Sequence, residues 1–291
     1  ITGSSDFEYT AGVDTTAKLL TLQVVGAGLS WNGTTTTGSS GPVAGGSGTW
    51  TASNSVTNWT NSAGTSRVAS DSAKAAIFAG TAGTVTVDTS SGPVGAKALK
   101  FLTSGFAITG GTLTLANAST APKVDVDGAS TVATISSVIA GSDGIEKIGA
   151  GTLILSGANT YAGGTTITDG TLRIASAGSL GAGSYSGAIS LASGTLLDYA
   201  SSATQTLSGA ITGTGGLTVS GTGTLTLSGA NAYSGATTIG SGAVVLSGGA
   251  AIGNQSAVTV ASGASLTVNA NETIGSLAGA GTVTLANVSQ L

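Results

Sequence analysis

The sequence predicts an all-β protein whose chain winds into a parallel β-helix, a β-solenoid with roughly 20 residues per coil. Three observations predict this fold: the glycine content, the alternation of aliphatic residues with Thr, and the regular spacing of the alternating segments. The chain has 291 residues, of which 49 are Gly and 40% are hydrophobic. Because each Gly inside a helix costs about 1 kcal/mol relative to Ala, we expect very little helix.

Short segments alternate apolar and polar residues, which is the period of a strand with one buried face. They begin at Leu153, Leu172, Leu196, Leu217, Leu225, Val244, Leu266 and Val283. Apart from the close pair at 217 and 225, the residue numbers of successive starts differ by 17 to 24. Hairpins with two-residue loops repeat more closely, so this spacing favours a coil whose equivalent residues stack about 4.8 Å apart.

The chain contains a longer internal repeat. The segment "GTLILSGANTYAGGTTITDGTLRI" from Gly151 matches "GTLTLSGANAYSGATTIGSGAVVL" from Gly223, an offset of 223 − 151 = 72 in residue number. We expect its Leu and Ile side chains inside, its Asn bonded to turn backbone and its Tyr packed over a corner. The residues predicted to build the repeat are Leu153, Leu155, Asn159, Tyr161, Ile167, Leu172, Leu225, Leu227, Asn231, Tyr233 and Ile239.

These motifs resemble a known family. The unit from Gly149 to Leu172 resembles the passenger-associated strand repeat of bacterial autotransporters, and the second copy departs from it at Ala232, Ala236 and Ala243. Residues 29–115 resemble the segment that often precedes such repeats. The resemblance implies a right-handed, single-stranded parallel β-helix, extracellular or on the bacterial cell surface, exported with the help of a C-terminal barrel. We expect either a passenger cleaved free or a piece of a longer protein.

The chain is predicted to have two parts. Residues 1–80 form an N-terminal cap with the first coils and hold Trp31, Trp50 and Trp59, whereas residues 81–291 form the β-helix with the passenger-associated repeats. Terminal coils of solenoids are atypical, so we interpret the tryptophans as a cap over the first coil. The alternative is an exposed, coplanar surface that stacks on sugar rings.

The charge pattern limits the partners. Only 7% of the residues are charged against about 25% in ordinary proteins, and no Lys/Arg-rich run offers a surface to nucleic acid. No stretch of about 20 residues is apolar enough for a membrane-spanning helix. Between Ala175 and Leu291 only Asp198 and Glu272 are charged. We predict self-association, end to end or side by side, because the charged residues that normally block pairing of strand edges are missing.

The residue inventory excludes several chemistries. Cys, His and Met are absent, so disulfides, thiolate chemistry and imidazole catalysis are excluded. A Ser nucleophile would lack a His base, and no Ser-x-x-Lys motif replaces it. We predict a non-enzymatic protein without a cofactor or a resident metal.

Asp125 and Asp127 are the best acidic candidates. Alternation places both carboxylates on the outer face of one strand, where they could bind Ca²⁺ or act with a nearby Lys in a polysaccharide lyase. No third carboxylate lies close in sequence, so a solvated strand face is favoured. The segment 143–147 (DGIEK) is interpreted in the same way.

The leading hypothesis is therefore a non-enzymatic extracellular structural or adhesive β-helix that mediates surface attachment, cell–cell association or assembly into a filament. Its partners would be further copies of the chain, surface glycans or other cells. Two alternatives remain open: a polysaccharide-active enzyme that uses Asp125, Asp127 and a neighbouring Lys, and a carbohydrate-binding surface built from the three tryptophans.

Overall fold

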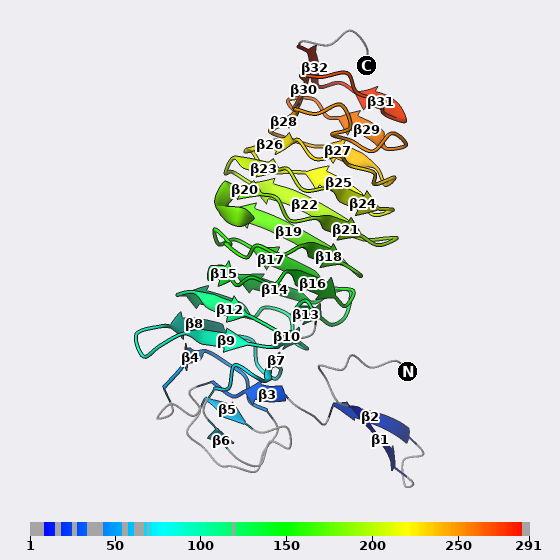
Figure 1. The fold of residues 1–291 in the computed structure, drawn as a ribbon. Coiled ribbons are helices and arrows are strands. Elements are labelled where there is room, and N and C mark those ends of the chain that lie inside the picture. Colours follow the sequence, from blue (N-terminus) through cyan, green and yellow to red (C-terminus); the bar gives the residue numbers. More distant parts are fainter. Residues whose placement is uncertain are drawn as a thin grey trace.

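The chain forms a rod of stacked coils (Figure 1), which confirms the predicted β-solenoid. The computed structural model describes residues 9–14, 19–24, 28–33, 43–53, 58–60, 67–68, 70–117 and 120–286. In these ranges the only helical element is a single 3₁₀ turn, η1 (Gly181–Gly183). The same ranges contain no helix long and apolar enough to cross a membrane.

Each regular coil crosses three faces in turn, and neighbouring coils pair in parallel. The first face contains, in order of pairing, β6 (Arg67–Val68), β5 (Trp59–Thr60), β3 (Gly28–Trp31), β7 (Ala75–Phe78), β10 (Ala98–Phe101), β13 (Lys123–Val126), β16 (Ile145–Ile148), β18 (Thr165–Ile167), β21 (Ile189–Leu191) and β24 (Ile211–Gly213). The second face contains β4 (Gly48–Thr51), β8 (Thr84–Asp88), β11 (Ala107–Gly110), β14 (Val132–Ile135), β17 (Thr152–Leu155), β19 (Thr171–Ser176), β22 (Leu196–Ser201), β25 (Gly216–Val219), β27 (Thr237–Ile239), β29 (Ala257–Val260) and β31 (Ser276–Gly279).

The third face is divided into two sheets. The first sheet contains β9 (Val94–Ala96), β12 (Leu113–Leu115) and β15 (Ile139–Ala140). The other sheet contains β20 (Ser184–Tyr185), β23 (Gln205–Leu207), β26 (Thr224–Leu227), β28 (Ala243–Leu246), β30 (Ser265–Val268) and β32 (Thr282–Leu285). Both sheets lie between the second and the first face in chain order, and their strands follow one another up the same side of the rod (Figure 1).

The register gives the length of the coil. One column of paired residues on the second face runs through Thr84, Ala107, Thr134, Ile154, Arg173, Asp198, Thr218, Thr238, Thr259 and Ala278. Its ends differ by 278 − 84 = 194 in residue number over nine steps, or about 22 per coil. This value agrees with the predicted period.

The core consists of columns of inward side chains. On the second face, the residues that follow those of the register column just described also form a column. It stacks the side chains of Val85, Ile108, Ile135, Leu155 and Ile174, each at most 2% exposed. Alternation along each strand produces this arrangement, because every second side chain points into the rod. Each fully buried aliphatic side chain contributes about 1.5–3 kcal/mol.

The N-terminal part of the chain pairs differently. Strands β1 (Tyr9–Asp14) and β2 (Leu19–Val24) form an antiparallel hairpin. Strand β5 is antiparallel to both β3 and β6, while β3 and β4 pair in parallel with β7 and β8. From β7 and β8 onward, every pairing between described strands is parallel.

The two copies of the internal repeat lie on different faces. In the first copy, β17, β18 and β19 lie on the second, first and second faces. Their counterparts in the second copy, β26, β27 and β28, lie on the third, second and third faces. The offset of 72 in residue number equals about three and a third coils at about 22 per coil, so the second copy is rotated by one face.

Each copy of the repeat interrupts one sheet. In the first copy the segment 157–163 forms no strand and pairs only through the single bridge between Ala158 and Ser179, and the third face divides between β15 and β20 there. In the second copy the segment 229–235 forms neither a strand nor a bridge, and the first face ends at β24. The repeat therefore contains the signal that ends a sheet.

One glycine is required at the same place in both copies. Gly170 and Gly242 both have φ of +66°, and a Cβ atom at either position would lie within about 2.5 Å of a backbone oxygen of the preceding coil. An L-residue is strained in this left-handed conformation, and the close approach leaves no room for a side chain. The corner before β19 and β28 therefore depends on Gly.

Candidate binding surface

The three tryptophans form a buried cap. Trp31, Trp50 and Trp59 are 0%, 2% and 2% exposed, and Trp59 packs edge-on against the other two with ring centroids 4.9 Å apart and interplanar angles of 75° and 71°. All three pack on Phe78 at the base of the regular stack. These rings are neither exposed nor coplanar, which corrects the alternative of a sugar-stacking surface: they cover the apolar interior of the first coils.

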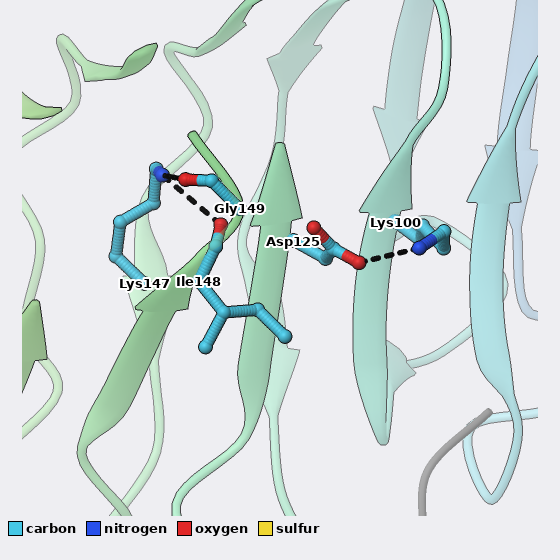
Figure 2. A network of polar contacts seen from close by, with 5 residues as sticks. All are labelled: Lys100, Asp125, Lys147, Ile148 and Gly149. Carbon is cyan, nitrogen blue, oxygen red and sulfur yellow. Dashed lines mark hydrogen bonds and ion pairs between the residues drawn. The ribbon is translucent and has the colours of Figure 1, made fainter. Parts of the chain in front are cut away.

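Asp125 is held in a buried ion pair. Its Oδ2 lies 2.5 Å from Lys100 Nζ on the adjacent strand β10, and the two side chains are 9% and 6% exposed. Figure 2 shows the Lys100 ammonium pointing at this carboxylate. Asp127, just beyond the end of β13, is exposed. The two carboxylates therefore do not form a solvated pair on one strand face, and the Asp125 carboxylate is occupied by Lys100.

Lys147 occupies a core position. On β16 it pairs in register with Val124 and Ile167, both buried, and Lys147 itself is 0% exposed. Its Nζ donates to the carbonyl oxygens of Ile148, Gly149 and Asp169 at 3.0, 2.6 and 3.1 Å, as Figure 2 shows for the first two. Burial lowers the pKa of Lys147 to about 8. The interpretation of 143–147 as a solvated face is therefore wrong for Lys147.

The residues predicted to build the repeat are all buried. This group consists of Leu153, Leu155, Asn159, Tyr161, Ile167, Leu172, Leu225, Leu227, Asn231, Tyr233 and Ile239. Their side chains therefore pack inside the rod.

Asn159 and Asn231 connect three successive coils. Asn159 Oδ1 accepts from the Ile139 amide at 2.9 Å, and its Nδ2 donates to the Ser179 carbonyl at 3.1 Å. Asn231 Oδ1 accepts from the Ile211 amide at 2.7 Å, and its Nδ2 donates to the Ala251 carbonyl at 2.6 Å. In both copies one partner lies in the preceding coil and the other in the following coil, so the Asn side chain replaces the ladder bonds that the interrupted sheet lacks.

A second polar side chain closes each interruption from the far side. Gln205 Oε1 accepts from the Leu180 amide at 2.7 Å, and Glu272 accepts from the amides of Ala251 and Ile252 at 2.9 and 3.2 Å. Burial raises the pKa of Glu272, while its backbone donors oppose that shift. Sequence analysis missed both residues, because each lies outside the repeat and two coils beyond the Asn that it complements.

A buried hydroxyl network follows each Asn. Tyr161 and Tyr185 both bond Thr165 Oγ1, at 2.9 and 2.8 Å, and Tyr185 also donates to the Gly163 carbonyl. In the second copy Tyr233 and Ser256 bond Thr237 Oγ1 at 2.7 and 2.8 Å, and Ser256 donates to Gly235. Burial raises the pKa of Tyr233 to about 12, so its hydroxyl stays protonated in the physiological range.

The outer surface of the C-terminal coils is polar and almost uncharged. On the second face Thr218, Thr238 and Thr259 stand in one column, and the nearest charged residue below them is Asp198. Asp198 is itself paired, with Arg173 Nε at 3.4 Å and Ser220 Oγ at 2.6 Å. The described residues contain no group of three or more Asp or Glu side chains placed to hold a metal ion. This geometry defines a class of protein, a β-solenoid whose C-terminal coils present a polar and nearly uncharged outer surface.

Comparisons with known proteins agree with this class and identify the family. The model of the passenger-associated-transport-repeat family matches residues 145–174 and 217–246, which contain the two copies described above and the six residues before each. Over 232 residues the chain is 40% identical to the adhesin BmaC autotransporter of Brucella suis biovar 1 (strain 1330), an alignment that covers 72% of this chain and 7% of the relative. No solved structure matches.

The chain belongs to the autotransporter passenger domains that carry passenger-associated repeats. The family resemblance of the repeat is thereby confirmed. Passenger domains of this kind are displayed on the cell surface or released outside the cell, so the protein is extracellular or surface-bound.

Proposed function

We propose that this chain is a non-enzymatic adhesive segment of a longer passenger, which attaches the bacterium to a surface or to another cell. The observation that carries the proposal is the 40% identity over 232 residues to a protein named as an adhesin. The chain spans 7% of that relative's length, so the relative's name does not say which of its segments attaches. That this segment attaches is our proposal. The rigid stack and the neutral hydroxyl-rich faces support it, since they offer many weak contacts over a large area.

The bonds made by Asp125 and Lys147 support a role without catalysis. A polysaccharide lyase needs a free carboxylate or amine in a cleft with converging charges. The Asp125 carboxylate is bound by Lys100, and the Lys147 ammonium is bound by three carbonyl oxygens inside a corner.

Adhesion is tested by removing whole coils from the displayed passenger. Thr84 and Thr259 occupy one register column, so a deletion of residues 85–259 joins equivalent positions of two coils and keeps the strands in register. We expect the shortened passenger to reach the surface of a non-adherent bacterial host in equal amount and to attach at least fivefold less well. Equal attachment by equal amounts of the two passengers would remove this segment from the adhesive part.

Self-association is a second candidate function, favoured by the depletion of charge. Only Asp198 and Glu272 are charged between residues 175 and 291, so two rods can approach along these faces with little repulsion. The variant Thr238→Lys/Thr259→Lys places two cations in the neutral column, and Thr84→Lys/Thr134→Lys is the matched control in the same column outside that region.

We expect the sedimentation coefficient of the wild type and of the control to rise with concentration, and that of the Thr238/Thr259 variant to stay constant. Electron microscopy of the concentrated wild type addresses the filament form. A wild type that stays monomeric at high concentration without filaments would exclude both forms of assembly.

A further inference from the structure

The second repeat leaves a groove on the first face of the rod. Above β24 this face lacks strands in the described chain, and a groove of about 550 Å³ lies there, walled by three successive coils. Thr214 comes from the first of these coils, Ala232 and Ser234 come from the second, and Asn254 and Gln255 come from the third. The volume lies within the range of about 300–1,000 Å³ that small-ligand sites occupy.

The floor of the groove is held rigidly. Tyr233 beneath it is 0% exposed, and its hydroxyl is bonded to Thr237. Asn231 ties the coil of the floor to the coils on both sides through Ile211 and Ala251. A preformed site of this kind loses little conformational entropy when a ligand binds.

The walls offer hydroxyl and primary amide groups. Thr214, Asn254 and Gln255 are exposed, and Ser234 is half-buried. Each primary amide has two N–H donors and a carbonyl acceptor, and each hydroxyl both donates and accepts. Adjacent hydroxyl groups of a sugar ring present the same pairing of donors and acceptors, so one amide satisfies two of them.

The groove is poorly suited to other ligand classes. None of its lining residues is ionisable except Tyr233, whose hydroxyl is buried, so phosphate, sulfate and carboxylate groups find no cation there. Its accessible apolar side chains are alanines, which give a peptide no deep pocket for an anchoring side chain.

From this geometry we propose that the groove binds a neutral oligosaccharide, with Asn254 and Gln255 bonded to ring hydroxyls and Thr214 and Ser234 completing the contacts. The proposal rests on the adhesive function above and names the class of molecule to which the segment attaches. The interruption in the first copy has a different structure. There the 3₁₀ turn η1 lies against Asn159, because the Ala182 amide donates to the Asn159 backbone carbonyl. We therefore assign the site to the second copy.

The test uses the purified full chain on an array of neutral hexose and N-acetylhexosamine oligosaccharides beside sialylated and sulfated ones. We expect retention on neutral glycans alone. The Kd for the neutral oligosaccharide that is retained best is then measured for the wild type, for Asn254→Ala/Gln255→Ala and for the control Asn269→Ala, an exposed amide outside the groove. The double variant should weaken binding at least tenfold, whereas the control should leave it unchanged.

The melting temperature of each variant serves as the check that it is folded. It should shift by less than about 2 °C, because the side chains of Asn254, Gln255 and Asn269 are all exposed. If the double variant melts lower, Ala232→Arg provides a second test, since it fills the groove from an exposed position on its floor.

Retention of charged glycans alone, no retention of any glycan, or neutral binding that survives these changes would each overturn the proposal. The attachment assay separates this inference from the proposed function. Attachment that is lost with residues 85–259 but kept by Asn254→Ala/Gln255→Ala overturns the glycan site and leaves the adhesive segment intact.

Discussion

The two copies of the repeat are built alike but lie on different faces of the rod. Both carry a buried Asn that bonds the coils on either side, a buried Tyr–Thr hydroxyl pair and a left-handed Gly with φ of +66°. These contacts are local and move with the sequence. The face on which they fall is set by the summed length of the intervening coils, which is not a whole number of turns. Local chemistry and global position are therefore specified separately in this fold.

The copies also differ at matched positions. Lys147 in the first copy corresponds to Val219 in the second, and both pair into the core. Outside the copies, Tyr185 and Ser256 are not at matched positions, yet each bonds the equivalent Thr hydroxyl and Gly carbonyl of its copy. The changes below test which of these features the repeat requires.

The largest effect is expected from a charge placed in the core of either copy. Leu153→Asp and Leu225→Asp would each bury a carboxylate without a partner at a position that is 0% exposed. We expect a loss of more than about 4 kcal/mol and local unfolding of the coil, measured by hydrogen exchange of the adjacent strands. Thr238→Asp introduces the same charge at an exposed strand position, so it serves as the control and should cost less than about 0.5 kcal/mol.

Asn159→Leu and Asn231→Leu should have the next largest effect. Each change leaves a buried amide N–H and a buried carbonyl without their partners, which costs about 1–3 kcal/mol for each group. Equal losses in the free energy of unfolding are expected from the two copies, with Asn269→Leu as an exposed control. A loss below about 1 kcal/mol in either copy would show that the Asn is dispensable there.

A smaller loss is expected from the hydroxyl that closes each network. Tyr185→Phe and Ser256→Ala both remove the donor to a glycine carbonyl and one bond to Thr, at a cost of about 1–2 kcal/mol. Urea unfolding of the two single variants and of their combination measures this effect. The two losses should add, because the networks lie in different coils; strong non-additivity would instead indicate that the copies communicate.

The smallest effect concerns Lys147→Val, which gives the first copy the residue of the second. Because burial lowers the pKa of Lys147 to about 8, the unfolded chain, with a pKa near 10.4, binds more protons between these values. The wild type therefore gains stability as pH rises from 8 to 10, and below pH 8 it carries the full cost of the buried charge.

Lys147→Val should lack this gain, so its free energy of unfolding relative to the wild type should fall over that window. We expect a fall of about 1 kcal/mol or less, because the three carbonyl oxygens that accept from the ammonium favour its charged form and oppose the effect of burial. The buried tyrosines are common to both proteins and cancel. Parallel curves of stability against pH for the two proteins would contradict the lowered pKa of Lys147.

Sequence patterns were sufficient for the periodic part of the structure. Alternation and spacing predicted the stack, and the self-similarity of the chain located both copies of the repeat, because local periodicity reports directly on which side chains point inward. Other features depend on pairs of coils. Asp125 meets Lys100 because coils of different length place them in register, and Gln205 and Glu272 close loops that belong to the preceding coil. No single segment contains that information.

The groove could not be predicted for the same reason. Thr214, Ser234 and Asn254 come from three successive coils, and nothing in their local sequence distinguishes them from the many other polar residues of the chain. They meet only because the second copy ends the sheet on that face.

The rotation of the second copy by one face has a mechanical consequence. A coil that lacks a strand is a weak point, because the force along the rod is carried there by a side chain instead of a ladder of backbone bonds. Two such points on the same face would form a hinge line along which the rod bends under shear. With one interruption on the third face and the next on the first, uninterrupted ladders on the other faces carry the load past each of them.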